Sequence, residues 1–224
     1  MNSLRLQFDQ LMIDVYRTNF DDAESKLDAF SEKHSTALTE NELDQKVTLL
    51  RAEICEHGGK RQEALNLNLE LWNRYSIVHY NYLPLGLTIV KLYFSLGQDE
   101  TASRFVEDSL LTVSDKDLEN YDPITLVKLL AVYLPKSGNH LDKIQAPMAY
   151  IEDKLEIQFD ENDLVRALEE VDNRIYQEGQ ELTKILALAG GETPQATIKH
   201  LKKFIELATL KPFRQEAINF LNSL

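Results

Sequence analysis

The segment EICEHGGKRQEAL, residues 53–65, contains two adjacent glycines followed by a lysine, a combination that can bind a phosphate group. A phosphate-binding loop has the pattern Gly-x-x-x-x-Gly-Lys-Ser/Thr after a buried strand, so that backbone N–H groups converge on the anion. Here Arg61 follows Lys60, and the residues before Gly58 have the apolar spacing of a helix. The sequence therefore predicts a corner between two helices at Gly59, and we expect no nucleotide cofactor.

Arg74 and His79 have the Arg-x4-His spacing, which resembles that of helical ribonucleases of the HEPN class. In that class the pair acts on the scissile phosphate, so a ribonuclease is an alternative function for this chain. The net charge of −13 disfavours it, because a nucleic-acid binder needs cationic surface to release counterions. The competing interpretation is that the histidine lies in an aromatic anchor with Trp72, Tyr75, Tyr80 and Tyr82.

Other residues with catalytic or metal-binding chemistry do not form a specific pattern. The five histidines are scattered, and no two of them lie four positions apart on a helix, as a helical zinc site would require. Glu53 and His57 do lie four apart, but one histidine and one carboxylate make a weak metal site. Cys55 is inside a helical segment, where a small core residue is expected. The sequence predicts no metal, no cofactor and no catalytic residue, and therefore a protein that is not an enzyme.

Apolar residues recur at steps of three and four along nearly the whole chain, which is the pattern of amphipathic helices. The longest stripe covers residues 164–189 and ends at two glycines. Asp122 and Thr193 each precede a proline, which predicts capped helix starts at both positions. Residues 75–83 are the best candidate for a strand, but they lack a partner strand and are interpreted as a connection. We expect an all-α protein with about eleven helices and no sheet.

A period near forty residues relates the predicted corners between helices. These corners are at Thr18-Asn19, Gly59, Gly97 and Gly138. Ala102 follows Ala64 by 38 positions, the same interval that separates the two middle corners. A glycine supplies the positive φ that ends a helix at least cost, and a small alanine five residues later lets the second helix pack against the first. Such a period is typical of stacked helical hairpins.

These features resemble the tetratricopeptide repeat, a helix-turn-helix unit of about 34 residues. The resemblance is best over residues 1–114 and is carried by Ala52, Gly59, Ala64 and Leu71 in one unit and by Tyr93, Gly97 and Ala102 in the next. It implies a right-handed α-α superhelix of stacked hairpins over residues 1–157. Residues 158–224 are then expected to form a long helix and a C-terminal helical pair that cap the array, within one continuous domain.

In tetratricopeptide arrays the first helix of each hairpin lines a concave groove that binds a peptide or a partner helix. The resemblance places nine residues in this groove: Arg5, Phe8, Met12, Tyr16, Lys46, Glu53, His57, Lys91 and Phe94. The alternative is that Phe8 and Met12 are ordinary core residues. Some members clamp a terminal carboxylate with paired Lys and Asn, and this set is not reproduced at Leu49, Glu53, Leu87 and Lys91.

Acidic residues are concentrated in residues 142–181, which carry 12 acids against 4 bases. One interpretation is a solvated helix surface, and the other is an acidic patch that steers a basic protein partner. The candidate contact residues in this block are Glu152, Asp153, Asp160, Glu161, Glu169 and Glu170. Adjacent acids on an exposed helix both stay ionised, so we expect no acid–base chemistry from them.

Charge and the lack of a catalytic pattern together favour a protein-binding function. The most specific hypothesis is an acidic inhibitor or immunity-type protein that binds and neutralises a basic toxin or nuclease domain. The alternative is an adaptor that holds a peptide or a partner helix in the groove. The segment 162–189 is a candidate surface for self-association through its long apolar stripe.

The remaining expectations concern location and other partner classes. Neither nucleic acid nor an anionic membrane is an expected partner of so acidic a chain. No apolar run approaches the roughly 18 residues that span a bilayer, and no charged-then-apolar leader opens the sequence. We therefore expect a cytoplasmic protein.

Overall fold

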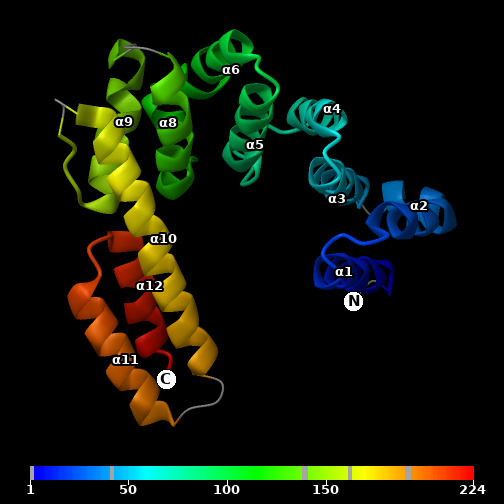
Figure 1. The fold of residues 1–224 in the computed structure, drawn as a ribbon. Coiled ribbons are helices and arrows are strands. Elements are labelled where there is room, and N and C mark those ends of the chain that lie inside the picture. The colour runs from blue at the N-terminus through cyan, green and yellow to red at the C-terminus, as the bar shows by residue number, and fades with distance from the viewer. Residues whose placement is uncertain (1–2, 41–42, 138–140, 161–162, 190–192) are drawn as a thin grey trace. The chain divides into compact units, whose positions relative to one another are not determined.

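The structure is a computed structural model that describes residues 3–40, 43–137, 141–160, 163–189 and 193–224. Over these residues it is all-α, with twelve α-helices, one π-helical segment and no strand (Figure 1). The predicted all-α class is confirmed, and the number of described helices is close to the expected eleven, while the superhelical arrangement stays a prediction. The contacts divide the chain into two compact units, Met1–Ala102 and Ser103–Leu224, which are described in turn. The expected division at residue 157 stays a prediction.

Unit 1, Met1–Ala102, consists of six helices, the last of which continues past the boundary. They are α1 (Ser3–Arg17), α2 (Ala23–Glu40), α3 (Asp44–His57), α4 (Arg61–Trp72), α5 (Tyr82–Ser95) and α6 (Asp99–Phe105). From α1 to α5, each helix packs against the next one in the chain. Leu4, Phe8 and Val15 form the buried face of α1 and join buried residues of α2 and α3 in one apolar cluster. This burial explains why the three-and-four spacing of the sequence produces packed helices instead of isolated ones.

The corners of unit 1 share one backbone arrangement. Asn19, Gly59 and Gly97 have positive φ values of 49°, 74° and 70°. At each corner the next N–H donates to a carbonyl five residues earlier: Phe20 to Val15, Lys60 to Cys55 and Gln98 to Tyr93, all at 2.8–3.0 Å. This is the hydrogen bond of a Schellman motif, which satisfies a carbonyl that the ending helix leaves free. The three predicted corners are confirmed, and the fourth, at Gly138, lies outside the described residues.

Lys60 does not face an open phosphate cradle. Its Nζ atom lies 2.8 Å from both carboxylate oxygens of Glu24 on α2. The predicted helical corner is therefore also the point at which α2 and the start of α4 are joined by an ion pair. This contact supports the structural interpretation of the two glycines over the phosphate-binding one.

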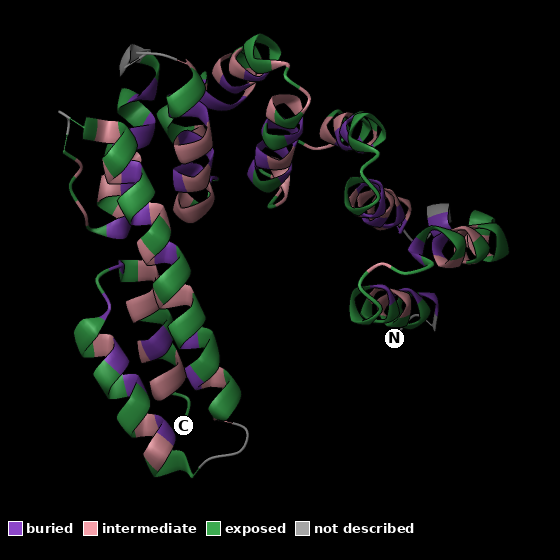
Figure 2. Cartoon of the chain, in the orientation of Figure 1, coloured by how far each residue is buried: buried purple, intermediate pink, exposed green. Residues whose placement is uncertain are grey.

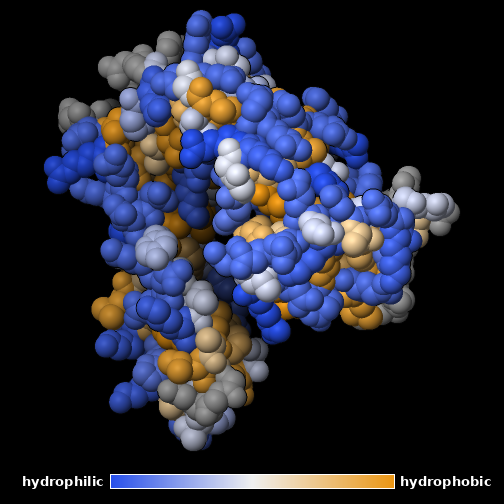
Figure 3. Space-filling model, turned by 45° about the vertical axis from the view of Figure 1, so that its right-hand side comes forward, coloured by the Kyte–Doolittle hydropathy of each residue, from blue (hydrophilic) through white to orange (hydrophobic). Residues whose placement is uncertain are grey.

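The connection between α4 and α5 contains stacked aromatic rings and no strand. The rings of Trp72 and Tyr82 lie 3.9 Å apart, and those of Tyr75 and His79 lie 4.1 Å apart with nearly parallel planes. The interpretation of residues 75–83 as an aromatic connection is confirmed. The same loop exposes Val78 and Tyr80, whereas hydrophilic residues cover most of the face of the molecule in Figure 3.

Unit 2, Ser103–Leu224, is built around one long helix. Its elements are the π-helical segment η1 (Val106–Leu111), α7 (Asp115–Leu118), α8 (Pro123–Ser137), α9 (Leu141–Leu155), α10 (Leu164–Leu188), α11 (Pro194–Leu207) and α12 (Lys211–Leu221). The 25-residue α10 buries Leu168, Val171, Ile175, Leu182 and Ile185 and packs against α8, α11 and α12. These residues form the apolar stripe of α10, and Figure 2 shows buried positions at intervals along this helix. Because this stripe is already covered within the unit, the self-association expected through residues 162–189 has no support from it.

The predicted capping residues have different outcomes. The Oδ2 atom of Asp122 accepts from the N–H of Thr125 at 2.9 Å, which caps α8 as expected. The side chain of Thr193 makes no capping hydrogen bond, although Pro194 begins α11 as predicted. Among the described helices, none combines the length and the apolar character that crossing a bilayer requires.

The corner residue Gly59 provides a direct test of this fold. A Cβ at this position would meet no atom within 4 Å, so Gly59→Ala costs only the strain of positive φ, about 1–2 kcal/mol. Gly59→Asn is the matched control, because asparagine tolerates this conformation and should cost less than half as much. Trp72, the one tryptophan of the chain, lies in unit 1, so its fluorescence during urea denaturation measures the loss. Equal stability of wild type and Gly59→Ala would contradict the corner geometry.

Candidate functional site

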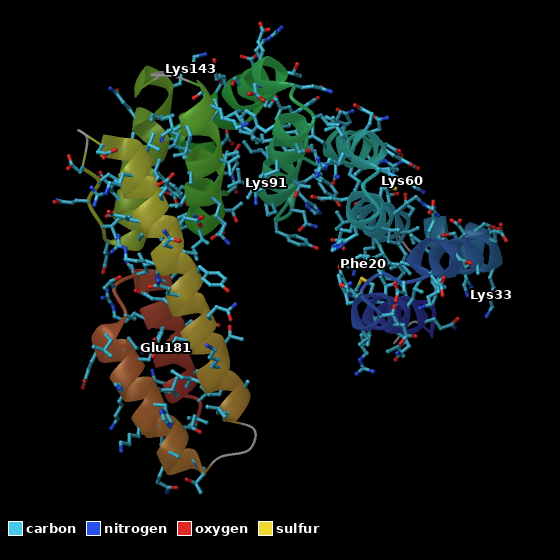
Figure 4. The ribbon with its side chains drawn as sticks, viewed as in Figure 1. Phe20, Lys33, Lys60, Lys91, Lys143 and Glu181 are labelled. Carbon is cyan, nitrogen blue, oxygen red and sulfur yellow. The ribbon has the colours of Figure 1, made fainter. Side chains whose placement is uncertain are left out.

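A cleft of about 890 Å³ lies in unit 1 where the α1–α2 turn, the first half of α2 and the end of α3 meet. Five carboxylates line it, and we call it the acidic cleft: Asp21, Asp22, Glu24, Asp28 and Glu32. Phe20, His57 and Lys60 are among the other lining residues; Phe20 and Lys60 are labelled in Figure 4.

Helix geometry and the turn explain why these acids converge. Glu24, Asp28 and Glu32 lie four residues apart on α2 and therefore share one face of the helix. Asp21 and Asp22 reach the same cleft from a tight turn in which Asp22 has a φ of 54°. The Oγ1 atom of Thr18 holds the start of this turn by donating to the carbonyl of Asp14 at 2.9 Å.

Only part of the negative charge in the acidic cleft is compensated. Glu24 pairs with Lys60 at 2.8 Å, and Asp28 pairs with Arg51 at 2.7 Å. Asp21, Asp22 and Glu32 form no ion pair with any residue that the structure describes. Within the described ranges, no group of three or more Asp, Glu, His or Cys side chains is placed to hold a metal ion. The cleft thus presents spread negative charge without a metal-binding cluster.

An aromatic group forms one wall of the acidic cleft. The ring of Phe20 stacks on the imidazole of His57, with centroids 3.8 Å apart and planes 14° from parallel. The ring of Tyr16 meets Phe20 edge-on at 5.4 Å, and its hydroxyl donates to the carboxylate of Glu53. The structure therefore brings together Tyr16, Glu53 and His57, three of the nine residues predicted to face a groove.

This group changes the ionisation of Tyr16. Burial is the largest cause, and together with the hydrogen bond to Glu53 and the charge of that carboxylate it raises the pKa of the Tyr16 hydroxyl to about 12. Below that pKa the neutral hydroxyl remains a donor to Glu53. The link between α1 and α3 is therefore fixed in one protonation state.

The other six predicted groove residues lie elsewhere. Phe8 is fully buried and Met12 packs against the same apolar cluster, which supports the core interpretation of both residues over the groove interpretation. Neither lines the acidic cleft. The remaining four, on α1, α3 and α5, are also outside it: Arg5, Lys46, Lys91 and Phe94.

The acidic block predicted in residues 152–170 lies in unit 2 and is divided among α9, the following loop and α10. Glu152 accepts from the N–H of Phe159 at 2.8 Å, and Glu170 pairs with Arg166 at 2.9 Å. Asp153, Asp160 and Glu169 are exposed, and Glu161 lies outside the described residues. Asp153 also pairs with Lys154 at 3.7 Å, so at least three members of the block have partners within the unit.

A neighbouring carboxylate, Glu156, shows the same use of acidic residues in unit 2. It pairs with Lys211 at 3.1 Å and with Arg214 at 2.6 Å. These contacts, with Lys211 the larger influence, hold the pKa of Glu156 below its usual value. The ion pairs connect the end of α9 to α12, so this acidic residue has a structural role.

The two residues of the ribonuclease alternative are engaged in other contacts. Arg74 pairs with the carboxylates of Asp44 and Glu70. His79 stacks between Tyr75 and Tyr80, and its Nδ1 atom accepts from the N–H of Asn81 at 3.1 Å. Two carboxylates beside the guanidinium oppose the approach of a phosphate. This geometry favours the aromatic-anchor interpretation.

Phe20 and the acids of residues 21–32 were not among the predicted site residues. The signal for the acids was present in the sequence, because Asp21-Asp22 is followed by acids at regular steps of four. Nothing in the sequence indicated Phe20, whose φ of 67° is unusual for a bulky residue. Its position depends on the stacking contact with His57, which is 37 residues away.

Comparisons with known proteins add no relative: no family model matches the chain, and no match was found among curated proteins or solved structures. The resemblance to tetratricopeptide repeats is neither supported nor opposed by them. The function is therefore inferred from the site itself.

The Tyr16–Glu53 contact predicts a specific pH dependence. The folded chain holds the Tyr16 proton more tightly than the unfolded chain does. The stabilisation that the protonated Tyr16 hydroxyl contributes is therefore complete below pH 10.0 and is lost as the pH rises toward about 12. Glu53→Gln should lower this pKa while burial keeps it above 10.0. NMR titration of the Tyr16 ring carbon, assigned with Tyr16→Phe, measures the change. An identical pKa in both proteins would show that the contact is absent in solution.

Proposed function

We propose that this chain is a non-enzymatic protein-binding module and that the acidic cleft of unit 1 holds a basic segment of a partner protein. The observation that carries the proposal is the set of three carboxylates, Asp21, Asp22 and Glu32, that line the cleft and form no ion pair with a described residue. Close like charges destabilise a folded chain unless an opposite charge is supplied. A basic partner supplies it.

The size and walls of the cleft support a peptide segment as the ligand. A volume of about 890 Å³ lies within the range of sites that enclose much of a ligand. Lysine and arginine have long apolar stems below their charged groups, and such stems pack on aromatic surface. Phe20 and His57 provide that surface beside the carboxylates.

Two narrower functions remain within this proposal. An inhibitor or immunity-type protein that neutralises a basic toxin or nuclease domain needs a partner of this charge, and the uncompensated acids support it. An adaptor that holds a peptide is the second candidate, favoured by the convergence of Tyr16, Glu53 and His57 at the edge of the cleft. Both use the same surface, so one experiment tests their common basis.

Binding of a hexalysine peptide, measured by isothermal titration calorimetry, tests the charge of the cleft. We expect wild type to bind it at low salt and to bind more weakly as salt rises, because ions screen exposed charges. Each exposed ion pair contributes roughly 0.2–1 kcal/mol, so the triple variant Asp21→Asn, Asp22→Asn, Glu32→Gln should bind about tenfold more weakly.

The matched control is Asp153→Asn, Glu169→Gln, Glu170→Gln, which removes the same amount of charge from the acidic block of unit 2. It should bind hexalysine as wild type does. A loss in this control with no loss in the cleft variant would assign binding to the acidic block and contradict the proposal. Absence of any hexalysine binding at low salt would contradict it as well.

A further inference from the structure

A second cleft of about 310 Å³ lies in unit 1 among α3, α4, the α4–α5 connection and the first half of α5. Leu49 and Leu85 are among its apolar walls, Glu53 and Glu56 bring two carboxylates from α3, and Asn68 enters from α4. We call it the Asn68 pocket. Six of the lining residues have polar side chains, and Asn68 is the one among these six that is buried.

Asn68 is an unusual residue for the interior of a helical hairpin. It is 2% exposed, and the structure describes only one other buried residue that is polar, Thr197. The Nδ2 atom of Asn68 donates to the carbonyl of Ala64 at 2.8 Å, and the side chain makes no further hydrogen bond to a described residue. One N–H and the carbonyl oxygen of the amide are left without a protein partner.

The side chain of Asn68 lies at the wall of the pocket. Among the described residues, His34 Nε2 is the one fully enclosed side-chain nitrogen or oxygen that has no partner. The Oδ1 atom of Asn68 is therefore not sealed in the core, and Asn68 is one of the residues that line the pocket. This oxygen has acceptor capacity that no described residue uses, so an N–H donor of a ligand can complement it.

The negative charge of the pocket indicates that the hydrogen-bond donor of the ligand is a cation. Glu53 and Glu56 lie on the same helix as His57 of the acidic cleft, and Glu53 precedes His57 by one turn. Glu56 is exposed and forms no ion pair with a described residue. A cation that enters the pocket meets carboxylates from α3 and the amide oxygen of Asn68 from α4. Leucine side chains beside them accept an apolar stem.

We propose that the Asn68 pocket binds one arginine side chain of the basic segment; the inference rests on the proposed function. A guanidinium group has five N–H donors in a planar fork and can donate to the Asn68 oxygen and to a carboxylate at the same time. A lysine ammonium is a compact, strongly hydrated charge that gains less from a buried amide oxygen. The pocket therefore distinguishes arginine from lysine within a basic partner.

Paired titrations with hexa-arginine and hexalysine peptides test this inference on the full chain. Wild type should bind hexa-arginine more tightly than hexalysine. Asn68→Leu removes both free amide groups at similar volume and should weaken hexa-arginine binding about tenfold, which corresponds to one hydrogen bond to a charged group. The affinity for hexalysine should not change. Urea denaturation followed by Trp72 fluorescence verifies that unit 1 of this variant remains folded.

A second variant keeps the test decisive where Asn68→Leu fails to fold. Glu56→Gln removes a charge from the exposed mouth of the pocket and should reduce the preference for hexa-arginine over hexalysine. The control Glu63→Gln removes a charge from α4 outside both clefts and should leave this preference unchanged. Equal binding of the two peptides by wild type, or an unchanged preference in Asn68→Leu or Glu56→Gln, overturns the arginine pocket. If hexalysine still binds through the acidic cleft, the proposed function stands; if neither peptide binds, both proposals fail.

Discussion

Reversal of the chain at a single left-handed residue is the constraint on which unit 1 depends. Asn19 and Gly59 end α1 and α3, and the same Schellman hydrogen bond follows each of them. The acidic cleft lies where these two corners meet, since Phe20 comes from the first and Lys60 from the second. A corner that ends the helix one residue later would rotate the following side chains away from this meeting point. Backbone geometry therefore determines the chemistry of the cleft.

Contacts between the two corners also determine which carboxylates of the acidic cleft remain without an ion pair. The Lys60–Glu24 ion pair and the Phe20–His57 stack join segments that are distant in sequence. The ion pair uses Glu24, and Asp28 pairs separately with Arg51. The carboxylates of Asp21, Asp22 and Glu32 remain without an ion pair to a described residue. In unit 2, by contrast, Glu156 and Glu170 are paired within the unit. These two acids therefore contribute to contacts within unit 2, and we propose that the three unpaired acids of the cleft contact a partner.

The sequence predicted the features that depend on local spacing. Apolar periodicity predicted the helices, including the long α10, and glycine predicted the corners at Gly59 and Gly97 because only positive φ fits there. The acidic cleft was not predicted. The number of charges along the chain is most one-sided in residues 142–181, whereas the acids of residues 21–32 form a cleft because the fold brings them together in space. Phe20 and Asn68 were missed for a related reason: the stacking of one and the burial of the other arise from tertiary contacts.

The location of the bound partner is the most direct test of this account. Titration of the isotope-labelled chain with a basic peptide, followed by amide NMR shifts, reports contact residue by residue. We expect the largest shifts in residues 21–32 and 53–60, a smaller group around Asn68, and little change in residues 152–170. Shifts concentrated in residues 152–170, with residues 21–32 unaffected, would contradict this expectation.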